Sequence, residues 1–307
     1  MRKTTRLRQL IEAPELLIMP AAYDPISAKL IERAGFKAVQ CTGLGIAASL
    51  LGRPDVSIIS MGEMVDRTYH IAHAVDLPVM GDGDTGFGNA VNVYYTVQEF
   101  ERAGAAGVNI EDQVMPKRCG HLAGKEVIPM EEMVLKIKAA REALVDKDFV
   151  INARTDTLAT HGLDEAVRRG NAYLEAGATM VFVDGVGTRE QIRALVAGIK
   201  GPVGINMVEG GKTPRDLTFS ELQAMGVARV SLSLTTFFAA IHGIKSVLQK
   251  VIENNGIRGY EDRIAGFEET HDLIGMGKVY ELEQKFLAPH TLSRKYEPLG
   301  KREPSTP

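Results

Sequence analysis

The fold class follows from residues 149 to 184, which read FVINARTDTLATHGLDEAVRRGNAYLEAGATMVFVD. Two short apolar runs, Phe149 to Asp156 and Met180 to Asp184, each end on an aspartate. Between them, Leu163 to Ala176 has the apolar spacing of an amphipathic helix. Near-continuous apolar strands that alternate with helices are typical of a parallel sheet covered on both faces.

The same unit recurs about eight times along the 307 residues. The other apolar runs are Leu16 to Tyr23, Ala38 to Thr42, Pro78 to Asp84, Gly107 to Asp112, Val203 to Val208 and Arg229 to Leu234. Amphipathic stretches lie between the runs, as in Asp24 to Ala34, Val91 to Ala103, Met130 to Leu144, Arg189 to Ile199 and Ser220 to Met225. Eight units predict an α/β fold of the (β/α)8 TIM barrel type, which usually has about 250 residues.

The count of eight units divides the chain into three segments. Residues 1–242 are expected to form the catalytic barrel. Residues 243–287 are expected to serve oligomerisation, because helical patterns continue beyond the strands, from Phe237 to Glu253 and from Ile264 to Phe286. Residues 288–307 are polar and proline-containing, which predicts a flexible tail.

Bulk properties exclude several classes of protein. The chain is 45% hydrophobic and 24% charged with a net charge of −3, which indicates a globular protein with no nucleic-acid partner. The two cysteines, Cys41 and Cys119, form no disulfide framework, so a reducing, cytoplasmic setting is expected. The basic N-terminus is interrupted by Glu12 and Pro14, which argues against a signal peptide. No segment has the roughly 20 apolar residues of a membrane span.

Polar residues gather where the strands of a barrel end, which is where barrel enzymes bind their ligands. They are Cys41 to Gly45, Asp82 and Asp84, Glu111 and Asp112, Arg154 and Asp156, Asp184, and Asn206 and Glu209. A single aspartate after a strand is commonly a helix cap or a solvated loop residue. Carboxylates from several strands would repel one another, which favours a divalent cation such as Mg²⁺ among them. Strand alternation places Asp82 and Asp84 on one face, where both can reach one ion.

Three further side chains have two interpretations each. A partly buried Arg154 could pair with Asp156 or clamp a substrate carboxylate, and the clamp is favoured by its place at the rim. Cys41 lies in an apolar run, which favours packing over chemistry. His161 precedes a helix and is expected to be an exposed loop residue.

The second cysteine has a different setting. Cys119 lies among Lys117, Arg118 and His121, with Gly120 beside it and no apolar periodicity around it. A thiol is most useful when its pKa is tuned and it is not sealed in a core. Two roles stay open at this point, nucleophile and general acid, and a protonated thiol is a competent acid toward a carbanion.

The assembled residues resemble the isocitrate lyase and phosphoenolpyruvate mutase superfamily from about Leu7 to Phe286. The markers are Lys-Arg-Cys-Gly-His at 117–121, Glu-Asp-Gln at 111–113, Asp-Thr-Gly-Phe-Gly at 84–88, Ala-Arg-Thr-Asp at 153–156 and Asn-Met-Val-Glu-Gly-Gly-Lys-Thr-Pro at 206–214. The first marker characterises a branch, chiefly of carbon–carbon lyases, that carries its cysteine on a gating loop. The last is similar to 2,3-dimethylmalate lyases and carboxyphosphonoenolpyruvate phosphonomutases.

The resemblance implies a Mg²⁺-dependent cleavage, with Mn²⁺ as a substitute, of a 2-alkylmalate or 2-methylisocitrate-like diacid to a 2-oxo acid and a carboxylate. It implies metal binding by Asp82 most directly, with Asp55, Asp84 and Glu111 around it, and a homotetramer that exchanges C-terminal helices. It places the pyruvate-like half of the substrate against Thr42, Gly43, Leu44 and Arg154. The other carboxylate would meet Asn206 and Thr213, and Lys117, Gly120, His121 and Asp184 are further candidate contacts. Cys119 would protonate the departing enolate, with Arg154 and Glu111 as the other catalytic candidates.

Three positions depart from the pattern of this branch, and one of them is Leu232, which stands where its members have the usual proline of strand eight. Gln40 stands where its lyases have tyrosine, and Asp184 where they have glutamate. Glutamine cannot act as a general base, so the departures predict an unusual substrate or weak activity. Three other functions remain open: a phosphonomutase-type enzyme of phosphorus–carbon bonds, an oxaloacetate hydrolase, and a non-catalytic protein that binds metabolites.

Overall fold

A computed structural model describes residues 1–118, 124–214 and 216–296. Its contacts divide the chain into two compact units, Met1–His242 and Gly243–Pro307. The first unit contains the sheet, and the second consists of helices and connecting segments. Each unit is described by itself below.

Eight parallel strands close into a barrel in the order of the sequence, which confirms the predicted (β/α)8 fold. The strands are β1 (Leu17–Ala22), β2 (Val39–Cys41), β3 (Val79–Asp82), β4 (Gly107–Glu111), β5 (Val150–Thr155), β6 (Met180–Val183), β7 (Val203–Met207) and β8 (Arg229–Leu232). The barrel closes where β1 pairs with β8, from Leu17 opposite Arg229 to Pro20 opposite Leu232.

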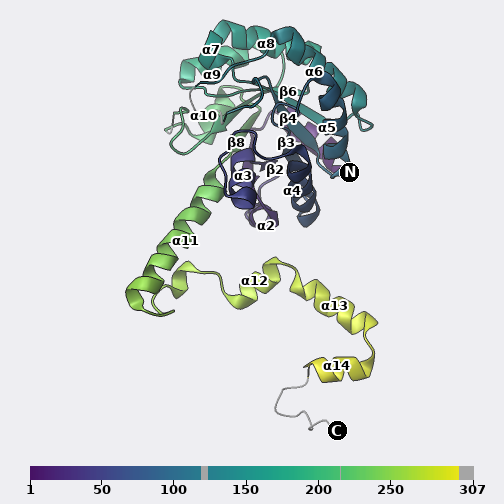
Figure 1. The fold of residues 1–307 in the computed structure, drawn as a ribbon, viewed down its shortest axis with the longest axis vertical. Helices are drawn as coiled ribbons and strands as arrows, with labels where there is room; N and C mark the ends of the chain where they lie inside the picture. Colours follow the sequence, from purple (N-terminus) through teal and green to yellow (C-terminus); the bar gives the residue numbers. More distant parts are fainter. Residues whose placement is uncertain (119–123, 215, 297–307) are drawn as a thin grey trace. The chain divides into compact units, whose positions relative to one another are not determined.

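Helices connect successive strands and surround the barrel, as Figure 1 shows for α5, α6, α8 and α9. They are α2 (Pro25–Arg33), α3 (Gly43–Leu51), α4 (Met61–Ala74), α5 (Ala90–Arg102), α6 (Met130–Ala143), α7 (Leu158–His161), α8 (Leu163–Glu175), α9 (Arg189–Gly198) and α10 (Phe219–Ala224). Side chains fix where several of them begin. Ser60, Asn89, Thr188 and Thr218 each accept a hydrogen bond from a backbone N–H of the first turn, which satisfies a donor that the helix leaves free.

Four helices of the first unit, α1, α3, α4 and α7, were not among those predicted from the sequence. The first, α1 (Lys3–Glu12), precedes the barrel and buries Leu7 and Ile11 on one face. The second, α3, begins at Gly43. It begins there because Thr42 accepts a hydrogen bond from the backbone N–H of Gly45 and so caps the first turn. Gly43 and Leu44 therefore lie in a helix that starts directly after β2.

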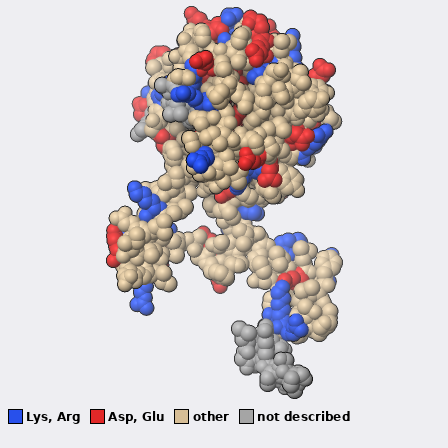
Figure 2. All heavy atoms as spheres, viewed as in Figure 1, with Lys and Arg blue, Asp and Glu red and all other residues tan. Residues whose placement is uncertain are grey.

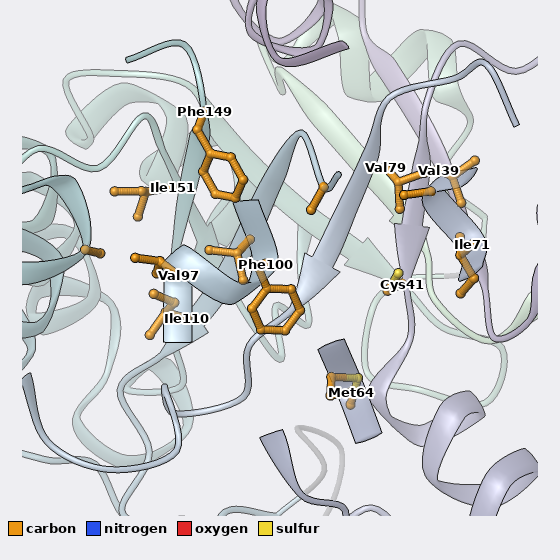
Figure 3. Close-up of a cluster of buried hydrophobic side chains, with 14 of the residues drawn as sticks. Val39, Cys41, Met64, Ile71, Val79, Val97, Phe100, Ile110, Phe149 and Ile151 are labelled. Atoms are coloured by element: carbon orange, nitrogen blue, oxygen red, sulfur yellow. The ribbon is translucent and has the colours of Figure 1, made fainter. Parts of the chain in front are cut away.

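Cys41 belongs to the core, as expected from its apolar run. Figure 3 shows it among Val39, Met64, Ile71 and Val79, and its side chain is 1% exposed. Burial raises the pKa of its thiol to about 12. A thiol with this pKa carries almost no thiolate at neutral pH, so it is chemically inert.

Helix α11 (Thr235–Asn254) corresponds to the helix expected over 237–253. The second unit differs from the sequence-based expectation in two respects. The expected helix over 264–286 is divided into α12 (Phe267–Leu273) and α13 (Met276–Phe286). Gly275, with φ of +86°, separates these two helices in a conformation that favours glycine. Part of the expected flexible tail is helical, because α14 (Pro289–Tyr296) is held to Glu283 of α13 by its Lys295 and Tyr296 side chains.

The exposed residues bear on the interactions of the chain. On the face that Figure 2 shows, acidic and basic side chains of the first unit are interspersed and do not gather in one patch. No helix in the described ranges is both long enough and apolar enough to cross a membrane.

Candidate active site

A pocket opens inside the barrel, and every strand from β2 to β8 contributes to its walls. Its empty volume is about 550 Å³, including the part that is open to solvent. The walls are formed mostly by polar and charged side chains. They include Gln40, Thr42, Asp55, Asp82, Asn109, Lys117, Arg154, Asp184, Asn206, Arg229 and Ser231. Most of the sequence-predicted site residues therefore meet in one place.

Asp82 ends β3 and faces the first turn of α3. Its Oδ2 accepts a hydrogen bond of 2.9 Å from the backbone N–H of Gly43. A Cβ atom at position 43 would lie only 2.7 Å from this oxygen, so the close approach requires glycine. The Thr42–Leu44 segment lines the pocket beside Asp82.

Asp84 reaches the same region by a route that the sequence did not indicate. Strand β3 ends at Asp82, so strand alternation does not extend to Asp84. Instead Asp84 has φ of +45°, and its backbone N–H donates a 3.2 Å hydrogen bond to Asp82 Oδ1. A turn therefore holds the two carboxylates together.

The Lys117 ammonium group lies among these acids. Its Nζ is 2.6 Å from Asp55 Oδ1 and 3.1 Å from Asp84 Oδ1, the latter within ion-pair distance but outside hydrogen-bond geometry. Burial acts to lower the pKa of Lys117, but Asp84, Glu111 and Asp55 outweigh it and hold the pKa well above its usual value. Burial raises the pKa of Asp84 to about 7, against the opposing effect of Lys117. Asp55 and Asp84 thus share one ammonium group, and Asp82 lies beside them.

The donors in this region fit a hard divalent cation. Both oxygens of Asp84 and Oε1 of Glu111 are buried and accept no hydrogen bond within the described ranges. Unpartnered carboxylate oxygens of this kind are the ligands that Mg²⁺ prefers, often through water. In the described part of the chain no three side chains already form a coordination shell, and Lys117 takes the place of a cation between Asp55 and Asp84.

Arg154 forms the structural pair that was one of its two interpretations from the sequence. Its Nε and Nη2 bind Asp156 at 2.8 and 3.0 Å, which is the structural pair. Its guanidinium also lies 3.2 Å from Glu111 and 3.2 Å from Asp184, and it lines the pocket. Burial raises the pKa of Glu111 well above its usual value, while Arg154 opposes this. Arg154 is therefore held rigidly by three carboxylates at the wall of the pocket.

Lys125 completes this charge cluster and was not identified from the sequence. Its Nζ lies 2.6 Å from Asp156 and 3.6 Å from Asp184. Burial acts to raise the pKa of Asp156, but Arg154 and Lys125 outweigh it and lower that pKa. Nothing in the local sequence of Lys125 distinguishes it from a surface lysine, because its partners are separated from it by more than 30 residues.

Asp112 follows Glu111 in the sequence but has a different environment. It accepts hydrogen bonds from Thr155 Oγ1 and Tyr173 at 2.7 Å, and from Arg169 Nη1 and the Asp156 N–H at 3.0 Å. Asp112 is fully buried and does not line the pocket. The expectation that Asp112 belongs to the rim of the site was wrong, because this hydrogen-bond network holds its carboxylate in the protein interior, away from the pocket.

The opposite wall of the pocket comes from β7 and β8. Asn206 lines the pocket, and its Oδ1 accepts hydrogen bonds from Ser231 at 3.1 Å and from Ser233. Thr213 is not part of this wall. Its hydroxyl donates a 2.6 Å hydrogen bond to the backbone carbonyl of Asn206, and it lines a neighbouring apolar groove. Thr213 thus supports Asn206 from outside the pocket.

Three of the predicted site residues, Cys119, Gly120 and His121, lie outside the described residues. His161 is exposed at the end of α7, as expected, and hydrogen-bonds Thr160. Arg229 was read from the sequence only as the first residue of a strand, yet it lies in the pocket. In the sequence, a charged residue at the edge of an apolar run indicates only where a strand begins. The closed barrel shows that the Arg229 side chain points into the pocket.

Comparison with known proteins gives the family. Residues 7–252 match the family model described as Phosphoenolpyruvate phosphomutase. The chain belongs to the phosphoenolpyruvate phosphomutase family. This confirms the resemblance that the sequence motifs indicated.

Individual members of the phosphoenolpyruvate phosphomutase family narrow the class of chemistry. The 2,3-dimethylmalate lyase of Eubacterium barkeri is 42% identical over 93% of this chain and 99% of its own length. The 2-methylisocitrate lyase of Aeropyrum pernix is 40% identical over 94% of each chain. The solved structure of phosphonopyruvate hydrolase with oxalate and Mg²⁺ has a TM-score of 0.85 and 34% identity, covering 94% of this chain and 100% of that chain. The names of the first two confirm the prediction of a carbon–carbon lyase.

Proposed function

We propose that this chain is a Mg²⁺-dependent lyase that cleaves a 2-hydroxy diacid to a 2-oxo acid and a carboxylate. The observation that carries the proposal is the meeting of Asp82, Arg154 and the Gly43 backbone in one pocket of the barrel, with Glu111 3.2 Å from the Arg154 guanidinium. The likeness to a 2,3-dimethylmalate lyase and a 2-methylisocitrate lyase supports a diacid of the 2-alkylmalate or 2-methylisocitrate type.

The cation would be held by Asp82, with Asp55, Asp84 and Glu111 around it. When bound, Mg²⁺ supplies positive charge against the oxygens of the oxo-acid half of the substrate. The structure of a related hydrolase with oxalate and Mg²⁺ supports this choice of metal, and Mn²⁺ is a chemical substitute for it.

The side chains of the pocket then bind and orient the substrate. Arg154 is fixed by Glu111, Asp156 and Asp184, so its guanidinium is presented to a carboxylate with little loss of rotamer freedom. The reaction breaks the bond between the hydroxyl-bearing carbon and its neighbour. The hydroxyl proton passes to water in the pocket, which is open to solvent, the carbinol carbon becomes the oxo carbon, and the electron pair stays on the departing carbon. That carbon then requires a proton.

We assign this proton to Cys119, which stands in the Lys-Arg-Cys-Gly-His segment of the sequence. A neutral thiol with an ordinary pKa near ~8.5 is a competent acid toward a carbanion. Replacing Cys119 by Ala or Ser is expected to abolish turnover while the fold and Mg²⁺ binding remain. Full activity of either variant would refute the role.

Thiol alkylation provides an independent test of the same residue. Cys41 is buried with a pKa of about 12, so of the two cysteines in the sequence it is the one that alkylation near pH 8 should spare. Iodoacetamide is expected to inactivate the enzyme with one modified thiol per chain. Mass spectrometry that finds Cys41 modified instead would contradict this reasoning.

The proposed reaction is tested directly by release of oxo acids. Purified protein with Mg²⁺ is incubated with a panel of 2-hydroxy diacids that differ in their alkyl substituents, and a coupled dehydrogenase detects pyruvate and other 2-oxo acids. Activity should disappear with EDTA and return with added Mg²⁺. If no substrate of the panel releases an oxo acid, the proposed lyase function is refuted.

A second candidate function is the chemistry of phosphorus–carbon bonds. It is favoured by the segment Asn206 to Pro214 and by 34% identity to a phosphonopyruvate hydrolase. Phosphorus NMR of a reaction with phosphonopyruvate distinguishes the two. A new phosphorus signal would favour this candidate, and an unchanged spectrum would exclude it.

We further propose that the chain forms a homotetramer. The helices α12, α13 and α14 bury no residue, and apolar side chains such as Ile252 and Phe267 are 81% and 80% exposed. Exposed apolar surface of this extent is typical of an interface between subunits. Light scattering should give a mass four times that of one chain, and a monomer would contradict the proposal.

A further inference from the structure

Arg229 is a cation in the interior of the barrel. It is the first residue of β8 and is 0% exposed, and its side chain reaches both Gln40 of β2 and Phe182 of β6. Gly204 of β7 makes room for it, since a Cβ atom there would lie 3.2 Å from Nη1 of Arg229. The guanidinium therefore crosses the barrel interior and lines the pocket.

The partners of this guanidinium leave it without a counter-ion. Its Nη2 donates a 2.7 Å hydrogen bond to Gln40 Oε1, and its carbon lies 5.6 Å from the centre of the Phe182 ring. Within the described ranges its Nε and Nη1 have no acceptor. Arg154, by contrast, has three carboxylates around it. Burial lowers the pKa of Arg229 to about 10, which still leaves it positively charged at neutral pH.

A buried guanidinium with free donors and no anion is costly to the fold. The cost is offset when a ligand brings the missing charge, and planar carboxylates are the anions that arginine binds best. The free donors belong to a residue that lines the pocket, so an anion bound there can reach them.

We propose that Arg229 binds a carboxylate of the substrate and selects dianionic ligands over monoanionic ones. The inference rests on the proposed function in one respect, namely that the substrate is a diacid. It adds a specificity residue on β8 that acts together with Asn206 and Arg154. Lys117 and Arg154 are already surrounded by acids, so Arg229 is the described cation of the pocket that can respond to a second carboxylate.

Gln40 has a defined part in this subsite. Its Nε2 donates to the backbone carbonyls of Cys41 at 2.9 Å and Met80 at 3.3 Å, which turns its Oε1 toward Arg229. A tyrosine hydroxyl has only one proton to donate, so it could not make these three contacts together. Gln40 is therefore a positioning residue for Arg229. This role is a physical reason for glutamine at a position where the lyases of this branch have tyrosine.

The test compares succinate with butyrate, which has the same number of carbons but one carboxylate. Calorimetry in Mg²⁺-free buffer measures both affinities for the wild type, Arg229→Gln and Arg193→Gln. Arg193 is an exposed arginine on α9 that pairs with Glu190 and serves as the matched control. The wild type and the control are expected to prefer succinate by roughly 10-fold or more, because a hydrogen bond to a charged group is lost with butyrate. Arg229→Gln should lose this preference, and an unchanged preference would overturn the inference.

Two further measurements keep the test decisive. If Arg229→Gln does not fold, Gln40→Leu provides a second variant, which keeps the charge of Arg229 but removes its hydrogen bond to Gln40. Gln40→Leu should weaken succinate binding several-fold and leave butyrate binding unchanged. Arg229→Met, of similar length and uncharged, should melt at the same temperature as the ligand-free wild type or higher. A large fall in Tm with an unchanged ratio of succinate to butyrate affinity would assign Arg229 a structural role.

The inference can fail separately from the lyase proposal. Loss of succinate preference in Arg229→Gln, with no oxo acid released by the wild type, would support the anion subsite and refute the lyase. Release of oxo acid by Arg229→Gln with the KM of the wild type would support the lyase and refute the subsite.

Discussion

Replacing Gly43 by alanine is expected to weaken Mg²⁺ binding while leaving the fold intact. A Cβ atom at this position would lie 2.7 Å from Asp82 Oδ2, whereas ordinary van der Waals contacts begin at 3.4 Å. The Asp82 carboxylate must therefore move by about 0.7 Å or more. It would then lose the 2.9 Å hydrogen bond from the Gly43 N–H that fixes its direction.

The size of the effect follows from this hydrogen bond. A hydrogen bond to a charged group contributes about 1.5–3 kcal/mol, which corresponds to a loss of Mg²⁺ affinity of roughly 10- to 100-fold. Global stability should change little, because alanine is favoured over glycine in a helix by up to about 1 kcal/mol. That gain opposes the cost of moving the carboxylate.

The assay is a calorimetric titration of Mg²⁺ into wild type, Gly43→Ala and a control, with urea unfolding of all three. Gly62→Ala is the matched control, because Gly62 lies in the first turn of α4 and a Cβ atom there meets nothing within 4 Å. The control should bind Mg²⁺ like the wild type. Equal Mg²⁺ affinity of Gly43→Ala and Gly62→Ala would refute the placing of Asp82 in the metal site.

Two further predictions concern the charge clusters of the barrel. Asp112→Ala is expected to lower the free energy of unfolding by about 3–5 kcal/mol, because it removes the buried acceptor shared by Thr155, Tyr173 and Nη1 of Arg169 and leaves Arg169 only Glu165 as a carboxylate partner among the described residues, and a loss below about 1 kcal/mol in urea unfolding would contradict this. Asp156, whose pKa Arg154 and Lys125 hold below its usual value against the effect of burial, should stabilise the fold fully above its unfolded pKa of about 3.9. The difference in unfolding free energy between wild type and Asp156→Asn should therefore be constant from about pH 8 to pH 5 and shrink as the pH falls below about 4, and a difference that already falls between pH 8 and pH 6 would contradict the assignment.

The strands and most of the rim were predictable because they follow from local patterns. A buried parallel strand needs a short apolar run, and Val150–Thr155 and Met180–Val183 have one. Asp82 and Arg154 could be assigned to the site because each stands at the end of its own apolar run, Val79–Asp82 and Val150–Thr155. The apolar run around Cys41 likewise predicted packing in the core.

The remaining features depend on contacts between distant parts of the chain. Arg229 meets Gln40 across 189 positions of sequence, and no local pattern shows that the side chain points into the barrel. The proximity of Asp84 to Asp82 was predicted for the wrong reason, since a left-handed turn and not strand alternation produces it. Asp112 was misplaced because adjacent residues at a strand end face opposite directions, and only Glu111 faces the ion cluster of Arg154.

The contact of Arg229 with Gly204 and Gln40 also restricts how this chain can diverge. The arginine needs a missing side chain on β7 and an oxygen acceptor on β2, so mutations at these three positions have to be inherited together. Homologues that keep arginine here should keep glycine and an acceptor at the other two sites, whereas homologues with an apolar residue are free to vary at both. The residues at positions 40, 204 and 229 would thus group homologous sequences by the charge of the ligand that each protein recognises, before any of the proteins is purified.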